Sequence, residues 1–275
     1  MGLRVGTNVP SLAVQRNIEA NGREQARSLS RLSSGQRIVN ASDDAAGLSM
    51  SQNLEAEIRG IRQAARNAND GVSFVQSAEG GLNEVSNILI RLRELGVQSG
   101  SDTVGEAERS FLDREYQSLK KEIERIAQVT TFSGRHLLNG RGDVLQFQVG
   151  TRSTENDVIR YKAEEANATL SRLGLTSSAV NSRRDALDSL EQVDNAIHMV
   201  SEYRSTLGAT QNRLHSAANN LGTQMESLSE ARSRIADTDV AEEASKLARN
   251  NMLQNAGIAV LAQANASPDR ALRLL

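Results

Sequence analysis

The feature that most restricts the fold is an alternation of three- and four-residue spacings that runs unbroken from Leu190 to Ile235. Eleven of its fourteen positions are apolar, so one narrow apolar seam extends over more than six heptads. This period predicts one long helix that packs against other helices. At 1.5 Å per residue the helix would be roughly 70 Å long, more than a compact domain of this size requires. The fourteen positions are Leu190, Val193, Ile197, Val200, Arg204, Leu207, Gln211, Leu214, Ala218, Leu221, Met225, Leu228, Arg232 and Ile235.

Shorter repeats of the same spacing in the first half supply packing partners for this helix. One repeat runs from Leu54 to Val75, slips by a residue near Gly80, and resumes from Ala78 to Leu92. Another runs from Leu112 to Ile126. Because seams this narrow are not stable alone in water, the helices should pack side by side. The expected fold is mainly α, a long antiparallel helical bundle or coiled coil.

The helical period is lost between residues 131 and 182. Apolar and polar residues alternate from Leu145 to Val149, and glycine-containing turns follow Phe132. The segment from Val158 to Tyr161 is a plausible pairing partner for the alternating stretch. Alternation with a period of two, bounded by glycine, is typical of short strands. We therefore expect a small β-rich cap that joins two helical halves.

The two ends of the chain are predicted to form separate helices. Asn8 is placed to cap the first and Gly35 to end it. Asp239 and Glu242 form a start similar to a capping box for the last helix, which Pro268 should kink or end. Both helices are rich in Ala, Ser, Asn and Gln, so their apolar faces are too weak to hold an isolated hairpin. We expect neighbouring copies to cover them.

Composition argues against an enzyme and against several partner classes. The net charge of −2 calls for neither nucleic acid nor membrane, and the absence of cysteine excludes disulfides and thiolate metal sites. The three histidines lack metal-ligand spacing, so no catalytic residue, metal site or cofactor is expected. We interpret the neighbouring carboxylates Asp43 and Asp44 as first-turn residues of a helix that Asn40 or Ser42 caps. The N-terminus lacks the apolar core of a cleavable signal peptide.

Two long segments at opposite ends of the chain resemble the terminal signatures of bacterial flagellins. The first is SLSRLSSGQRIVNASDDAAGLS, from Ser28 to Ser49. The second is DTDVAEEASKLARNNMLQNAGIAVLAQAN, from Asp237 to Asn265, followed by a leucine-rich end. The likeness extends over nearly the whole chain. The variable outer region that larger members carry is missing, so the resemblance is to a short form.

The resemblance implies a structural subunit that polymerises into the flagellar filament, with five segments. Residues 1–42 and 237–275 would pair as inner-core helices, and residues 43–130 and 183–236 would form the outer bundle around the β-rich residues 131–182. A head-to-tail contact that does not close builds such an open helical polymer. The expected subunit-interface residues are Leu12, Ile18, Leu29, Leu32, Leu247, Ile258 and Leu261.

The resemblance also implies partners and a location. The filament is extracellular and used for motility, and the chain would reach it through the flagellar export apparatus without a cleavable signal peptide. A cytoplasmic chaperone would bind the C-terminal segment, and cap and hook-junction proteins would bound the filament. A segment around Leu89 resembles the part of flagellins that a flagellin-sensing Toll-like receptor recognises, with Arg91, Leu95 and Glu115 at the matching positions.

Two alternatives remain open from the sequence. A hook–filament junction protein shares the terminal helices but forms a short adaptor ring, and Ala45-Ala46-Gly47 fits flagellins better. A cytosolic coiled-coil scaffold would explain the heptads but neither the weakly apolar termini nor the β-rich cap.

Overall fold

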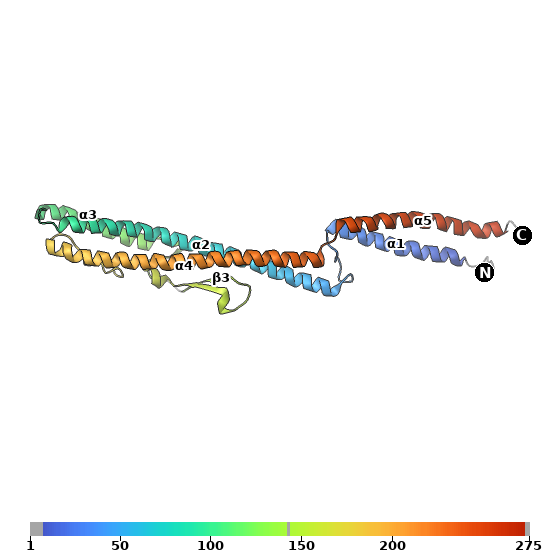
Figure 1. Ribbon diagram of the computed structural model, residues 1–275, viewed down its shortest axis with the longest axis horizontal. Coiled ribbons are helices and arrows are strands. Elements are labelled where there is room, and N and C mark those ends of the chain that lie inside the picture. Colours follow the sequence, from blue (N-terminus) through green and yellow to red (C-terminus); the bar gives the residue numbers. More distant parts are fainter. Residues whose placement is uncertain (1–7, 142–143, 273–275) are drawn as a thin grey trace. The chain divides into compact units, whose positions relative to one another are not determined.

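The computed structural model describes residues 8–141 and 144–272 and is mainly α (Figure 1). Side chains are described for these residues except Glu164 and residues 267–272. The helices are α1 (Val9–Ser34), α2 (Ala45–Ser99), α3 (Glu106–Val129), α4 (Arg183–Ala236) and α5 (Val240–Leu272). Four short strands and two 3-10 turns lie between α3 and α4.

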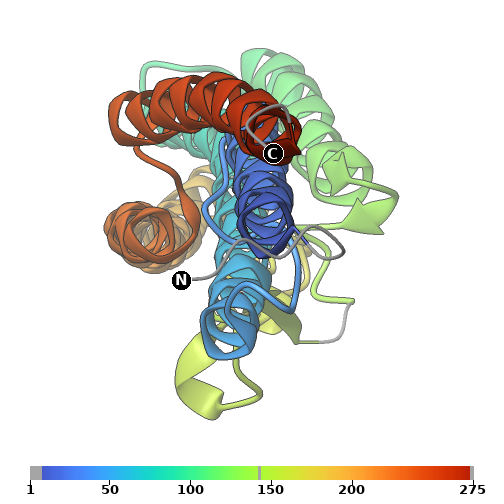
Figure 2. The same ribbon diagram turned by 90° about the vertical axis from the view of Figure 1, so that its right-hand side faces the viewer.

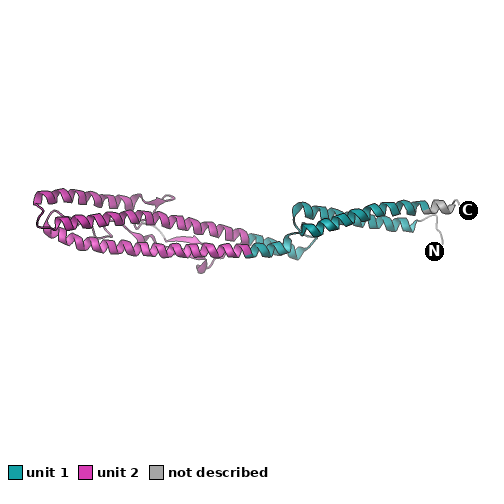
Figure 3. Cartoon of the chain, turned by 45° about the horizontal axis from the view of Figure 1, so that its top comes forward, with its two compact units in different colours: residues 1–56, 227–275 teal, residues 57–226 magenta. Residues whose placement is uncertain are grey.

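The chain forms two compact units, coloured separately in Figure 3. Unit 1 comprises residues 1–56 and 227–275, and unit 2 comprises residues 57–226. The boundary falls within α2 and within α4, so each of these helices contributes to both units.

Unit 2 has a continuous apolar core between α2, α3 and α4. The long repeat of the sequence lies on α4, and each of its fourteen positions is buried or half-buried. On α2 the positions from Ala68 to Leu95 that follow the same spacing are also buried. The prediction of narrow seams that pack against one another is confirmed.

The β-rich part consists of two antiparallel hairpins in unit 2. Strand β1 (Thr131–Phe132) pairs with β2 (Arg135–His136), and β3 (Leu145–Gln148) pairs with β4 (Val158–Tyr161). The predicted pairing of the alternating stretch with the segment from Val158 is confirmed, with Phe147 opposite Ile159. Aromatic rings attach this part to α2, because Phe74 makes edge-to-face contacts with Phe132, Phe147 and Tyr161 at centroid distances of 5.8, 5.6 and 5.2 Å.

Two predicted helix starts and one predicted end are confirmed. The Oδ1 of Asn8 accepts a hydrogen bond from the Ser11 amide, 3.2 Å away, at the start of α1. Gly35 ends α1 in the left-handed region, with φ of 70°, which glycine adopts without strain. At the start of α5, Asp239 Oδ1 accepts from the amides of Ala241 and Glu242.

The predicted start of α2 was wrong. Residues Asn40 to Asp43 form a turn closed by a hydrogen bond from the Asp43 amide to the Asn40 carbonyl, so they lie outside the helix. Asp44 is the capping residue, because its Oδ1 accepts from the Gly47 amide at 2.8 Å. Asp43 Oδ2 instead accepts from the Asn40 and Val39 amides. These bonds, the one from Asn40 above all, lower the pKa of Asp43.

Of the two effects predicted for Pro268, an end of the helix was wrong, since α5 continues through it to Leu272. A proline removes one intrahelical hydrogen bond, because it has no amide proton to donate to the carbonyl four residues earlier. Here that carbonyl belongs to Ala264, and it accepts instead from Asn8 Nδ2 at 2.9 Å. A side chain from the other end of the sequence therefore replaces the missing donor.

Candidate self-assembly surface

Within unit 1, α1 and α5 lie side by side and antiparallel, blue and red in Figure 2. The buried and half-buried positions that face the partner helix again follow three- and four-residue spacing. We call these positions the terminal seam. On α1 they are Ser11, Val14, Ile18, Asn21, Gln25, Ser28 and Leu32. On α5 they are Glu243, Leu247, Asn250, Gln254, Gly257, Leu261 and Ala264.

Polar side chains make many of the contacts across the terminal seam. Ser11 Oγ and Asn265 Oδ1 are hydrogen-bonded at 2.8 Å. Asn21 Nδ2 donates to the Asn250 carbonyl at 2.6 Å, and Gln25 Nε2 donates to Asn251 Oδ1 at 2.5 Å. A neutral hydrogen bond contributes only about 1 kcal/mol net, since it replaces bonds to water. The hydrogen bonds of the terminal seam therefore contribute little to the free energy of unfolding. Their main effect is to select one partner helix and one alignment.

An acidic group is buried at the first turn of α5, beside the last turn of α1. Glu243 is 4% exposed and lies 3.8 Å from Arg31 Nη1 and 3.6 Å from Lys246 Nζ. Glu242 forms a closer pair with Lys246, at 2.7 Å, and this hydrogen bond raises the pKa of Lys246. Backbone bonds from Arg37 to Ala236 and from Thr238 to Gly35 join the segments beside the two helices.

Large apolar side chains of unit 1 are exposed, away from the terminal seam. Met252 is 71% exposed and Leu29 is 60% exposed. Large apolar side chains in a soluble single chain are more often covered, and a set of them gathered on two helices is typical of an interaction surface. We call the members on α1 and α5 the exposed apolar set: Val9, Leu12, Leu29, Val240, Met252, Leu253, Ile258 and Val260.

The seven residues predicted to form subunit contacts fall into two groups. Leu12, Leu29 and Ile258 belong to the exposed apolar set. The other four are half-buried within the terminal seam: Ile18, Leu32, Leu247 and Leu261. In the single chain these four therefore pack between α1 and α5.

Met252, Leu253 and Val260 were not predicted from the sequence, because they follow no single stripe. Another signal could have found them: residues 250–268 contain no charged side chain. A surface helix normally carries charged or polar residues on the face opposite its apolar stripe, so a long stretch without charge is a sign that more than one face is covered. The second half of α5 has this character, whereas α1 carries Arg16, Glu19 and Arg23 on exposed positions.

The three residues of the receptor-like segment lie in unit 2. Arg91 donates to Glu115 Oε1 at 2.9 Å and to Glu94 Oε2 at 2.8 Å, which links α2 to α3 on an exposed face. These bonds, first the one with Glu94, raise the pKa of Arg91. Leu95 is fully buried in the core beneath. The structure therefore brings Arg91 and Glu115 together and places Leu95 out of reach of a partner.

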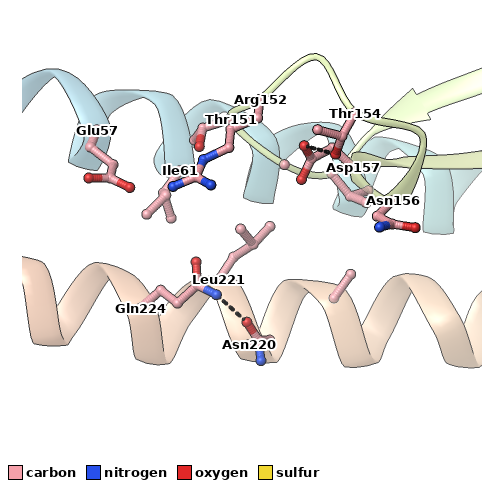
Figure 4. A pocket seen from close by; sticks show the side chains of 13 residues that line it. Glu57, Ile61, Thr151, Arg152, Thr154, Asn156, Asp157, Asn220, Leu221 and Gln224 are labelled. Atoms are coloured by element: carbon pink, nitrogen blue, oxygen red, sulfur yellow. Dashed lines mark hydrogen bonds between the residues drawn. The ribbon is translucent and has the colours of Figure 1, made fainter.

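Unit 2 also contains a groove of about 560 Å³ between α2, α4 and the segment 149–157 (Figure 4). Ile61 and Leu221 provide apolar lining, and polar side chains surround them. Asp157 accepts from Thr154 at 2.6 Å and Asn220 accepts from Gln224 at 2.7 Å. Across the described parts of the chain, no cluster of three or more His, Cys, Asp or Glu side chains could hold a metal ion. The described helices include none that is apolar enough to span a bilayer.

Comparison with known families gives the decisive observation. Residues 5–143 match the bacterial flagellin N-terminal helical region, and residues 190–275 match the bacterial flagellin C-terminal helical region. A flagellin of Halalkalibacterium halodurans is 41% identical over 271 residues, which cover 98% of this chain and 99% of that protein. The chain belongs to the bacterial flagellin family.

Solved structures agree with this flagellin assignment. The crystal structure of Bacillus cereus flagellin is 30% identical, with a TM-score of 0.51, and the match covers 57% of this chain and 88% of that one. A putative flagellar hook-associated protein from Vibrio parahaemolyticus has a TM-score of 0.59 over 71% of this chain and 100% of that one. Its identity is 16%, so that likeness shows a shared fold and does not favour the hook-junction alternative.

As a flagellin, the chain is a structural protein that polymerises into the extracellular flagellar filament and serves motility. At 275 residues it is a short form, and its flagellin-like ends account for most of its length.

Proposed function

We propose that the paired helices α1 and α5 form the inner core of the filament, and that the exposed apolar set makes the contacts between copies. Residues 1–42 and 237–275 then act as the assembling part, while residues 43–130, 131–182 and 183–236 build the outer part. The observation that carries this proposal is the polar terminal seam beside uncovered apolar side chains. Burying those side chains against other copies would remove apolar area from water at about 25 cal/mol per Å².

The proposal extends to the four half-buried residues of the predicted interface. Ile18, Leu32, Leu247 and Leu261 would hold α1 and α5 together while Leu12, Leu29 and Ile258 contact other copies. Both groups are needed for the same assembly, because the exposed side chains are presented only when the two helices are paired.

The test compares two neighbouring substitutions on α1 in seeded polymerisation of the full chain. Leu29→Asp places a carboxylate where the proposal expects burial, which costs several kcal/mol. Ser30→Asp adds the same charge at the next exposed position. We expect no filament growth from Leu29→Asp by sedimentation and electron microscopy, and growth close to the parent rate from Ser30→Asp. Normal growth of Leu29→Asp would refute the proposed contact surface.

We further propose that the chain has no catalytic role and travels through the flagellar export apparatus. A chaperone would bind the C-terminal segment before export, and cap and hook-junction proteins would contact the assembled filament. The family membership supports these partners, and the absence of cysteine suits passage of an unfolded chain. Pull-down of a chaperone by the full chain but not by a chain lacking residues 237–275 would test the first contact.

We also propose recognition by a flagellin-sensing Toll-like receptor through Arg91 and Glu115, with Leu95 supporting them from the core. Their pairing on an exposed face supports this. Arg125, which pairs with Glu122 on α3, is a matched control because it is an exposed arginine with an acidic partner. A reporter assay in which Arg91→Ala and Arg125→Ala signal equally would refute the assignment.

A further inference from the structure

Pro268 creates a requirement for a hydrogen-bond donor inside α5. In a regular helix the amide of residue 268 would donate to the carbonyl of Ala264, but proline has no amide proton. Helix α5 nevertheless continues to Leu272. A carbonyl that is left without a donor weakens the helix unless another group reaches it.

Asn8 supplies that donor while it caps the other helix. Its Oδ1 accepts from the Ser11 amide at 3.2 Å, and its Nδ2 donates to the Ala264 carbonyl at 2.9 Å. A carboxamide carries both an acceptor and a donor, whereas ionised aspartate only accepts. Serine caps a helix equally well, but its side chain is shorter and has no second polar arm. Capping alone therefore does not explain why asparagine suits this position.

The terminal seam needs polar contacts to fix its alignment. Its α5 side presents Asn250, Gln254 and Gly257 in succession, which offer no large apolar side chain. A shift by one heptad would move Ile18 from Gly257 to Asn250 or Ala264, and none of these three residues has a large apolar side chain. In coiled coils, polar residues at seam positions select one alignment when apolar packing does not. Two such contacts lie where α1 begins. Asn8 is hydrogen-bonded to Ala264, and Ser11 is hydrogen-bonded to Asn265.

We propose that Asn8 is a positioning residue that fixes the alignment of α1 and α5 by donating to the carbonyl that Pro268 leaves free. This inference rests on the proposed role of the two helices in the filament core. Asn8 then controls which apolar side chains of the two helices come to the same level of the assembly. Without the Asn8 carboxamide, α1 and α5 would pair in more than one alignment, and neighbouring copies would contact different surfaces.

The experiment uses the absence of cysteine, because introduced pairs can then report alignment in the full-length chain. Ile18→Cys with Gly257→Cys reports the native alignment, since these two positions are in contact. Ile18→Cys with Asn250→Cys reports a shift of one heptad. Each pair is combined with Asn8, with Asn8→Ser, and with Asn8→Ser plus Pro268→Ala. Crosslinks in seeded polymers and the critical concentration are measured.

We expect the native crosslink to dominate with Asn8 in place. Asn8→Ser should raise the shifted crosslink and increase the critical concentration about fivefold, the loss of one neutral hydrogen bond. Adding Pro268→Ala should leave the shifted crosslink high, because the new amide donates to Ala264 within α5 and makes no contact with α1. An unchanged crosslink pattern in Asn8→Ser, or a return to the native pattern when Pro268→Ala is added, would overturn the inference. Failure of the parent chain to polymerise would instead contradict the proposed function.

Discussion

At the scale of single residues, the buried hydroxyl of Tyr161 makes the stability of the fold depend on pH. The side chain is 4% exposed and its ring packs edge-to-face on Phe74. Its Oη has no hydrogen-bond partner among the described residues. Burial, aided by the charge of Glu165, raises the pKa of Tyr161 above its ordinary value of 10.0.

The sign of the resulting pH dependence follows from linkage. The folded chain prefers the neutral phenol, so the contribution to stability is complete below pH 10 and is lost as the pH rises above it. We expect Tyr161→Phe to raise the free energy of unfolding at pH 7 by about 1 kcal/mol, because an unsatisfied hydroxyl leaves the core. Above pH 10 the advantage should grow. Urea denaturation followed by circular dichroism at pH 7 and pH 11 checks both, and an advantage that shrinks with pH would contradict this account.

Residue-level prediction from the sequence succeeded where the interaction is local. Asn8 and Asp239 lie directly before helical periodicity, and their capping bonds span two or three residues. It failed at Asp44, because three neighbouring polar side chains compete for one cap and only the turn geometry decides. The predicted end at Pro268 was wrong, because the donor to Ala264, Asn8, lies 256 residues from Ala264 in sequence.

At the scale of elements, glycines on α2 mark where other segments approach the helix closely. A Cβ at Gly81 would lie 2.7 Å from Leu138 Cδ1 and 2.9 Å from Thr130 Oγ1. Leu138 is fully buried, and the Thr130 hydroxyl is held by the Ile126 carbonyl. At the neighbouring Gly80 nothing lies within 4 Å. The two adjacent glycines are therefore a matched pair.

We expect opposite effects of alanine at these positions. Gly80→Ala should raise the free energy of unfolding by about 1 kcal/mol, because alanine favours the helix. Gly81→Ala gains the same helix propensity, but its methyl group would displace Leu138 and Thr130. Its free energy of unfolding should therefore be about 2 kcal/mol lower than that of Gly80→Ala. Thermal and urea unfolding of the two full-length variants measure the difference. Equal stabilisation by both would show that the β1 region does not pack tightly on α2.

The element pattern was predictable, and the surfaces were only partly so. The three- and four-residue spacing identified α4, and the alternation with a period of two identified β3 and its pairing with β4. Each pattern can be read along a single segment. The close approach at Gly81 depends on Leu138 and Thr130, which belong to other segments and leave no period in α2. Likewise, the contact residues predicted on α5, namely Leu247, Ile258 and Leu261, omitted Met252 and Leu253, which are exposed.

At the scale of the whole molecule, the two units differ in whether they bury a large apolar core of their own. Unit 2 has its own apolar core around α2, α3 and α4. In unit 1 the helices α1 and α5 bury polar side chains and expose most of the apolar ones. A unit of this kind gains stability from neighbours, and a repeated contact between copies that does not close produces a filament.

The most direct test of this account is seeded polymerisation, viewed by electron microscopy, of the intact chain beside a chain lacking residues 1–40 and 237–275. Circular dichroism first establishes that the shortened chain remains helical, as the separate core of unit 2 predicts. The account predicts long tubes from the intact chain and none from the shortened one. Tubes from the shortened chain, or only rings and finite oligomers from the intact one, would contradict it.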